Sequence, residues 1–535
     1  MYLFWLGIMV AGVVVGFVGW VSGLGMLLVW EVTGVGGLEW SMVLYFDCIS
    51  VLFLGFMLMI SFVVLIYSGE YMGSSSGRFF GLMFLFVFSM VLVISSPSMM
   101  SIVLGWDGLG VVSYFLVVFY GGASVDYSGM ITYLSNRIGD VVLFMVMGWL
   151  VVMGSWNFMW WGEGCWWLGG LVMVVGMTKS AQFPFSAWLP EAMAAPTPVS
   201  ALVHSSTLVA SGIYLMMRYG GLFVYGSEVV FIGLGTMIFS GLMAMGEMDS
   251  KKVIAFSTLS QLGMMMMGLG LGLKVLVFFH LLVHAVFKSL MFLSMGVVIE
   301  GLGGEQDVRW MGGHMQVMPL VGVIFNVSVL SLVGFPFLSG FYSKDYMVEW
   351  VWSSMSGGVM ELMVIMGLVL TVGYGLRFWC KVWVGGYKGM VVGTNVFGWV
   401  YAVVLSVLCL MVVIVGAWLS VILCYDYVMV SVMEKVVPLF SLMIGVGLVS
   451  LFSDKVSGVL GSLWDISSYG VSSGFMKLSS MVMVLEDGWL VYEGNVGSGL
   501  MRKVIGLAII YFGIDLKYMM LLFFFLMLFY VVVFM

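Results

Sequence analysis

Charged residues are scarce in this 535-residue sequence: Asp, Glu, Lys and Arg make up 8% of it, while hydrophobic residues make up 63%. So few polar groups cannot cover a globule of this size in water, which excludes a soluble protein. The net charge of −7 is spread over short loops with no block of one sign, and this gives no indication of nucleic acid as a partner. The composition therefore places the chain in a lipid bilayer.

Cysteine is also scarce, and its spacing excludes a metal or disulfide framework. None of the five cysteines forms a Cys-x-x-Cys pair, and most lie in apolar runs, as expected of small core residues. The sequence also has no G-x-x-x-x-G-K-[S/T] motif, no dinucleotide-binding G-x-G-x-x-G after a strand and no set of cluster-ligating cysteines. We therefore expect no cofactor and no metal bound by this chain. The cysteines are Cys48, Cys165, Cys380, Cys409 and Cys424.

Long apolar runs, by contrast, fill most of the chain. Runs of about 17 to 27 residues recur, and each is long enough as a helix to cross a hydrocarbon core of roughly 30 Å. They are continuously apolar and do not alternate, which predicts helices rather than barrel strands. We predict an all-α polytopic membrane protein with about 15 to 16 transmembrane helices. The expected spans are 3–30, 41–67, 79–95, 99–120, 129–153, 166–181, 197–217, 229–246, 253–273, 275–299, 316–334, 360–384, 397–423, 429–452 and 518–535.

Interior charges divide the chain into parts. They concentrate between residues 107 and 345, and the spans on either side are almost purely apolar. After residue 453 the pattern becomes mixed apolar and polar, which is typical of an amphipathic segment lying along other proteins or the membrane face. We expect five parts: N-terminal transmembrane helices (1–95), a channel core (96–380), C-terminal transmembrane helices (381–453), an amphipathic lateral segment (454–517) and a final transmembrane helix (518–535).

Several ionisable residues lie inside the apolar runs, and together they indicate an ion or proton path. A Lys or Asp at mid-membrane costs about 2.5 to 3.5 kcal/mol on insertion-based scales, so a chain with many of them must pair or hydrate them. The residues are Asp107, Asp140, Lys179, His204, His280, His284, Lys288, Lys344 and Asp345.

The most specific pattern is FFHLLVHAVFKSLMFL, in which His280, His284 and Lys288 are spaced four residues apart. On a helix they form one stripe that rises about 6 Å per step, which favours a water-filled file. The alternatives are satisfied hydrogen bonds between helices, or a zinc site built on the two histidines. No Glu follows His280 directly, and a lysine beside the pair opposes a dication.

Asp107 and Lys179 form a candidate ion pair between two helices, and a fixed structural salt bridge is the alternative. Lys288 has a different expected role. Burial and nearby cations disfavour its charged form, so this lysine is suited to storing and passing a proton.

Four of the eight prolines fall between Lys179 and Ser206. Pro184 follows Lys179 by five residues and frees backbone carbonyls, which are tolerated in hydrocarbon only where protein or water satisfies them. The sequence therefore predicts a helix break with water beside Lys179. Phe183-Pro184-Phe185 is repeated as Phe335-Pro336-Phe337 before Lys344, which predicts a second broken helix.

Three long motifs resemble the antiporter-like subunits of respiratory complex I: KSAQFPFSAWLPEAMAAPTPVSALVHSSTLVASGIYL, KKVIAFSTLSQLGMM and HLLVHAVFKSLMFL. Four more, GWDGLGVVSYFLV, SNRIGDVVLF, EQDVRWMGG and GFPFLSGFYSKD, narrow the resemblance to the mitochondrial form of one such subunit. The resemblance implies a proton channel of two inverted repeats, each with a discontinuous helix.

The resemblance also assigns roles to individual residues. Asp107 stands at the family's acidic partner position, where many relatives have Glu, Lys179 at the pair lysine and Lys288 at the central lysine. The shorter Asp107 would need closer helices or a bridging water to reach Lys179. The polar-axis histidines are His204, His280 and His284, and the distal end where protons leave carries Lys344 and Asp345.

In such a complex, NADH, FMN, iron–sulfur clusters and ubiquinone are expected in other subunits. The expected partners are other membrane-arm subunits, reached in part by the lateral C-terminal segment, and the lipid bilayer. The excess of Met, with 52 residues, fits an organellar gene and hence the mitochondrial inner membrane. Two alternatives stay open: a cation/proton antiporter subunit of the same fold, and a structural arm subunit that pumps nothing.

Overall fold

The computed structural model describes residues 25–35, 38–73, 76–157, 166–219, 226–354, 358–384, 398–423 and 432–451. The expected amphipathic segment 454–517, the final span 518–535 and the expected span at residues 3–24 lie outside these ranges.

Helices dominate the described residues. The first half of the chain contains β1 (Met26–Val35), β2 (Leu38–Phe46), α2 (Cys48–Tyr71), α3 (Ser76–Ser95), α4 (Met99–Val117), η2 (Val118–Tyr120), α5 (Ala123–Met153), α6 (Trp166–Lys179), α7 (Trp188–Glu191), η4 (Ala192–Ala194), α8 (Thr197–Val199), the π-helix η5 (Ser200–Thr207), α9 (Leu208–Tyr219) and α10 (Gly226–Gly246). The second half contains α11 (Ser250–Gly270), α12 (Lys274–Gly301), α13 (His314–Val317), α14 (Pro319–Val333), α15 (Ser339–Ser354), α16 (Gly358–Trp379), the π-helix η7 (Cys380–Val384), α17 (Trp399–Ile422) and α18 (Val432–Leu451).

Within the described ranges, ten helices are long and apolar enough to cross a membrane, and three shorter apolar helices accompany them. This confirms the prediction of an all-α polytopic membrane protein. The continuous apolar runs form helices because, without water, a backbone must satisfy its own hydrogen bonds.

The chain before α2 differs from the prediction. We expected spans over 3–30 and 41–67. The second is present as α2 from residue 48 onwards, but residues 26–35 and 38–46 pair as an antiparallel hairpin, with Met26 opposite Phe46. The two segments are apolar, which made them resemble helical spans, but they are rich in β-branched and aromatic residues that favour strands. The first described helix then starts at Asp47, which caps it. The Asp47 carboxylate accepts a hydrogen bond from the Ser50 amide at 3.1 Å, and the Ser50 hydroxyl accepts one from the Asp47 amide.

Both expected helix breaks are present. The first begins where α6 ends at Lys179, and Ala181 follows with a left-handed φ of 54°. The indole of Trp188 donates a hydrogen bond of 3.0 Å to the Thr178 carbonyl, which satisfies one of the freed groups. The second break separates α14 from α15, where Gly334 has a φ of 91° and Phe337 a φ of 68°.

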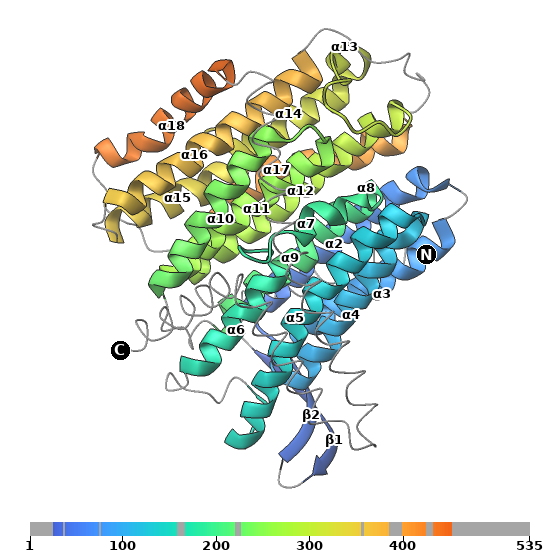
Figure 1. Cartoon of the computed structure of the whole chain (residues 1–535), viewed down its shortest axis with the longest axis vertical. Helices are drawn as coiled ribbons and strands as arrows, with labels where there is room; N and C mark the ends of the chain where they lie inside the picture. The colour runs from blue at the N-terminus through green and yellow to red at the C-terminus, as the bar shows by residue number, and fades with distance from the viewer. Residues whose placement is uncertain are drawn as a thin grey trace, which may run out of the picture. The chain divides into compact units, whose positions relative to one another are not determined.

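Helix α12 lies at the centre of the described bundle. It packs against α2, α11, α14, α15, α17 and η5, and Figure 1 shows it among these neighbours. Its interior from Leu276 to Ile299 is buried throughout. The stripe of ionisable residues predicted from the sequence therefore runs through the core of the bundle and does not face lipid.

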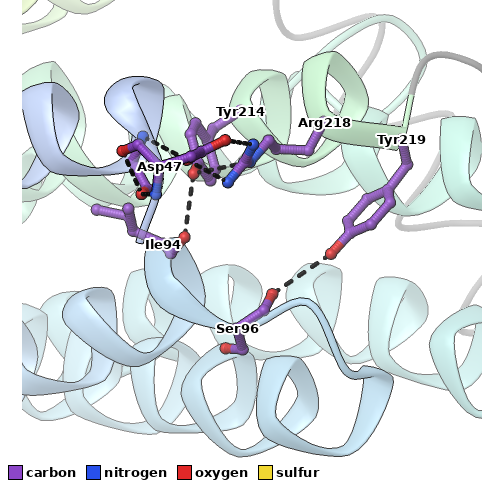
Figure 2. A network of polar contacts seen from close by, with 7 residues as sticks. Asp47, Ile94, Ser96, Tyr214, Arg218 and Tyr219 are labelled. Carbon is purple, nitrogen blue, oxygen red and sulfur yellow. Dashed lines mark hydrogen bonds and ion pairs between the residues drawn. The ribbon is translucent and has the colours of Figure 1, made fainter. Parts of the chain in front are cut away.

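The end of the bundle where α2 begins and α9 ends is held by an ion-pair network (Figure 2). The Arg218 guanidinium donates to both carboxylate oxygens of Asp47, at 2.5 and 2.8 Å, and to the Tyr214 hydroxyl at 3.1 Å. Tyr214 in turn donates to the Ile94 carbonyl at 3.0 Å. Burial raises the pKa of Asp47, but the hydrogen bonds and charge of Arg218 outweigh it, so that pKa lies below its ordinary value of 3.8. The network ties α2, α3 and α9 together.

Candidate functional site: a buried polar axis

The buried polar axis is the series of ionisable side chains that runs from Asp107 to Asp345. A three-residue charge cluster forms its first end. One guanidinium nitrogen of Arg137 lies 3.6 Å from the Asp107 carboxylate and 3.2 Å from that of Asp140. Asp107 is on α4, and the other two are on α5. The Asp140 side chain is 7% exposed, whereas those of Asp107 and Arg137 are about one third exposed. One cation therefore serves two carboxylates at the edge of the buried region.

Lys179 is fully buried at the C-terminal end of α6. Its ammonium donates a hydrogen bond of 3.4 Å to the Trp106 carbonyl and lies 5.0 Å from the centre of the Trp106 ring. Among the described residues, no carboxylate oxygen lies within 4.0 Å of it. The expected direct pair with Asp107 is therefore not formed in this structure. Asp107 is instead paired with Arg137, although it follows Trp106 directly and so stays near Lys179.

His204 lies on the π-helix η5, which follows the first helix break, and is 1% exposed. The His204 ring interacts with the Ala192 backbone, but within the described ranges neither ring nitrogen makes a hydrogen bond of good geometry. Its ring lies 6.2 Å from that of Trp188. A buried imidazole without a well-formed hydrogen bond to protein is a natural position for water.

The three residues of the α12 stripe, His280, His284 and Lys288, are each 2% exposed or less. The Nδ1 of His280 lies 2.8 Å from the Ser343 hydroxyl and its Nε2 3.3 Å from the Gln261 amide oxygen. The His284 ring centre is 6.3 Å from that of His280, and its Nε2 has no partner in the described part of the chain. The Lys288 ammonium donates to the Ser257 hydroxyl at 2.5 Å. The stripe is thus bordered by neutral hydroxyl and amide groups from α11 and α15.

Lys344 occupies the second helix break. Its ammonium donates to the Thr371 hydroxyl at 2.9 Å and to the Val333 carbonyl at 3.2 Å, a carbonyl that the end of α14 leaves free. Ser343, its neighbour in sequence, contacts His280, so the stripe on α12 leads directly to Lys344. Asp345 is half-buried and lies beside Gly334 at the same break.

The sequence did not identify every polar residue along the axis. It missed Lys251, which is 5% exposed and donates a hydrogen bond of 3.0 Å to the Ala195 carbonyl. It also missed Arg137, although a positive charge three residues before Asp140 in the NRIGD motif could have indicated an ion pair. The hydroxyl and amide partners gave no such signal, because Ser, Thr and Gln are common in helices for other reasons. They are Ser257, Gln261, Ser343 and Thr371.

The arrangement is suited to moving protons between basic groups. Amines, imidazoles and hydroxyls accept and donate protons, and the spaces between them are of the kind that buried water fills. The zinc alternative gains no support from geometry. In the described ranges, no group of three or more His, Cys, Asp or Glu side chains is placed to hold a metal.

The sequence matches two family models. One describes the transmembrane region of NADH:quinone oxidoreductase and Mrp antiporters and covers residues 96–371. The other describes the N-terminus of chain 5 of NADH-ubiquinone oxidoreductase (complex I) and covers residues 30–80. Together they cover the whole polar axis.

Two relatives of similar sequence carry the same name. The NADH-ubiquinone oxidoreductase chain 5 of Aedes aegypti is 41% identical over 403 residues, which is 73% of this chain and 70% of the relative. That of Anopheles gambiae is 37% identical over 498 residues, 87% of this chain and 86% of the relative.

Two solved structures share the fold. A chain of the Mrp complex from Dietzia sp. DQ12-45-1b aligns with a TM-score of 0.76 at 23% identity, over 94% of this chain and 59% of that one. A chain of the membrane-bound sulfane sulfur reductase, an archaeal respiratory membrane complex, aligns with a TM-score of 0.69 at 18% identity, over 84% of this chain and 94% of that one.

Proposed function

We propose, from the premise that this chain belongs to the NADH-ubiquinone oxidoreductase chain 5 family, that it is a proton-translocating membrane-arm subunit of respiratory complex I. It moves protons through the buried polar axis and works in the mitochondrial inner membrane. Electron transfer from NADH to ubiquinone takes place in other subunits, which hold FMN and the iron–sulfur clusters.

One observation carries this proposal. Lys288 lies in α12, which is buried throughout from Leu276 to Ile299, and its one hydrogen bond within the described bundle is to a neutral hydroxyl. A lysine that served only structure would be paired with a carboxylate, because an unpaired buried charge is costly. A lysine held by a hydroxyl alone exists readily in both protonation states, which a proton path needs.

The first step of the mechanism depends on Arg137. Asp107 and Asp140 attract the charged form of Lys179, and Arg137 competes with Lys179 for the same two carboxylates. When Arg137 pairs more closely with the carboxylates, the charged form of Lys179 loses stabilisation, and its proton passes through water to His204. When Arg137 moves away, Lys179 takes up a new proton.

The later steps follow the order of the elements. His204 passes the proton to Lys288, and the stripe of His284 and His280 carries it to the Ser343 hydroxyl beside Lys344. A second positive charge arriving near Lys344 favours release of the proton that Lys344 holds, because like charges repel. Asp345, at the same break, receives that proton on its way out.

The assembly follows the same proposal. The residue range 96–380 forms the channel core, with transmembrane helices on either side of it in the sequence. The lateral segment 454–517 reaches neighbouring membrane-arm subunits, and the span at 518–535 anchors it.

Substitution of Lys288 by Met tests the proposed function. Lys288→Met removes the titratable amine and keeps the length of the side chain, so we expect assembly of the complex and a lower number of protons pumped per electron. The ratio is measured in proteoliposomes with NADH as electron donor. Lys252→Met is the control, because Lys252 is a partly exposed lysine that pairs with Asp249 at 3.7 Å outside the axis. Wild-type stoichiometry in assembled Lys288→Met would refute a channel through Lys288.

The structural likeness to a chain of an Mrp complex makes a cation/proton antiporter subunit the second candidate. Sodium-dependent proton movement in proteoliposomes without a redox partner would favour it over the first. A structural arm subunit predicts unchanged pumping in every axis variant that assembles.

A further inference from the structure

The four-residue spacing of the α12 stripe continues beyond Lys288. After His280, His284 and Lys288 it passes Phe292 and Gly296 and reaches Glu300. Each step rises about 6 Å and turns by about 40°, so the series winds slowly along α12 for roughly 18 Å from Lys288 to Glu300. Glu300 is the last residue but one of α12, at the bundle end where α2 also ends and α17 begins. A partly exposed carboxylate thus stands at one end of this series.

A second helix continues the polar contacts from Glu300. The Tyr401 hydroxyl on α17 donates a hydrogen bond of 2.9 Å to the Glu300 carboxylate. The Tyr401 ring packs against that of Tyr67 on α2, with 4.9 Å between ring centres. Tyr401 is 3% exposed and Tyr67 is fully buried. The side chains of Tyr401 and Tyr67 therefore extend from the partly exposed Glu300 carboxylate into the core of the bundle.

Gly296 marks the inner end of this contact chain. A Cβ added there would lie 2.5 Å from the Tyr67 hydroxyl and 2.8 Å from the Thr197 hydroxyl. The two hydroxyls therefore face the same space, which exists because residue 296 has no side chain. The Tyr67 and Thr197 hydroxyls interact with each other, and the Thr197 hydroxyl also interacts with that of Tyr71. Within the described ranges, however, neither the Tyr67 nor the Thr197 hydroxyl makes a hydrogen bond of good geometry, although both residues are at most 1% exposed.

Two adjacent buried hydroxyls without a well-formed hydrogen bond need an explanation. Each costs about 1 to 3 kcal/mol if left without a partner, so a purely structural site would favour Phe and Val at these positions. A water molecule between the two hydroxyls would satisfy both.

From Thr197 the route continues along one segment of chain. Thr197 begins α8, which leads directly into the π-helix η5 that carries His204. The His204 ring nitrogens likewise make no hydrogen bond of good geometry in the described part of the chain. Figure 1 shows α8 beside α2, and both pack against α12. Thr197 and His204 therefore lie seven residues apart on one buried segment, which leads from the hydroxyl pair toward the polar axis.

We propose that Glu300, Tyr401, Tyr67 and Thr197 form a proton access route from the aqueous face at the end of α12 to His204 and Lys288. The proposal rests on the proposed function of the axis. Glu300 collects a proton and passes it to the Tyr401 oxygen, which gives its own proton inward. The Tyr67 and Thr197 hydroxyls, with water between them, do the same, so no oxygen along the route stays charged. Rotation of the hydroxyls then resets the route.

A pair of substitutions at Thr197 tests the route. Thr197→Val keeps the shape of the side chain and removes its hydroxyl, whereas Thr197→Ser keeps the hydroxyl. In assembled complex I we expect the proton-pumping rate of the Val variant to fall about tenfold and that of the Ser variant to stay near wild type. The rate is measured per assembled complex in proteoliposomes, in H2O and in D2O. The Val variant should also show the larger solvent isotope effect, which a merely structural role would not produce.

Tyr67→Phe provides an independent test at the next position, and the same slowing is expected. Tyr214→Phe is its matched control, because it removes a buried tyrosine hydroxyl at the opposite end of the bundle. Wild-type pumping in assembled Thr197→Val and Tyr67→Phe would overturn the route. If one of the two fails to assemble, the other decides.

The Lys288→Met variant separates this proposal from the proposed function. Loss of pumping in Lys288→Met with wild-type pumping in both hydroxyl variants leaves the axis intact and refutes the route. Wild-type pumping in Lys288→Met refutes the axis, and the route with it.

Discussion

Arg137 is the residue whose position most changes the interpretation of the polar axis. The sequence suggested a candidate ion pair between Asp107 and Lys179. In the structure, Arg137 instead pairs with the carboxylates of both Asp107 and Asp140. Sequence reasoning singled out several ionisable residues inside the apolar runs, although it missed Arg137 and Lys251. The sequence could not identify the ion pair that Asp107 forms, because hydropathy predicts which segments span the membrane but not which helices contact one another. The shorter Asp side chain at position 107 was the one hint that direct contact with Lys179 would fail.

Arg137→Gln removes the cation that competes with Lys179 for the two carboxylates. Lys179 should then be held more firmly in its charged form, so we expect the pumping rate to fall several-fold while the complex still assembles. Stability should change by about 1 kcal/mol or less, because this guanidinium is one third exposed. Lys252→Gln removes a different, partly exposed ion pair and serves as the control. Equal pumping rates in Arg137→Gln and wild type would contradict the competition.

Among the elements, the two broken helices were predictable and the hairpin was not. Proline placement and the repeated Phe-Pro-Phe motif pointed to both breaks, since a missing amide donor acts locally. The hairpin of β1 and β2 depends on pairing between two segments, which a count of apolar residues cannot distinguish from a helix. The π-helical turn at His204 was not predicted either, because its sequence carries no signal that separates it from an α-helix.

Gly340→Ala tests the second break as an element. A Cβ at residue 340 would overlap the Ser331 carbonyl, which places α15 directly against α14. Because backbone cannot yield as a flexible side chain does, we expect a loss of about 1 to 3 kcal/mol in stability and a lower melting temperature of the detergent-solubilised complex. Gly235→Ala is the matched control, since nothing lies within 4 Å of the added Cβ. Equal melting temperatures for the two variants would show that the contact is not tight.

For the whole molecule, the sequence predicted the fold class and the burial of the axis in its central helix. It gave no indication of the Asp47–Arg218 pair, whose members are 171 residues apart. Such long-range contacts are set by how helices pack, and no local pattern encodes them.

The pair gives a prediction about acid stability. Asp47 has a lowered pKa in the folded protein, so its contribution is present above the ordinary pKa of 3.8 and is lost as pH falls through the folded value. Asp47→Asn should therefore lower the melting temperature of the complex at pH 7, by a loss of about 1 to 3 kcal/mol. The difference from wild type should shrink below about pH 4. A difference that stays constant down to pH 3 would assign the loss to packing.

Lys344 is also a helix cap, because its ammonium holds the carbonyls of Leu332 and Val333 at the end of α14. A neutral amine has fewer hydrogens to donate and no charge to set against the negative end of the helix dipole. Each proton that leaves Lys344 in the proposed mechanism therefore loosens the last turn of α14, and each that arrives tightens it. Proton occupancy and backbone stiffness at this break would then rise and fall together, which gives the passage of a proton a mechanical output.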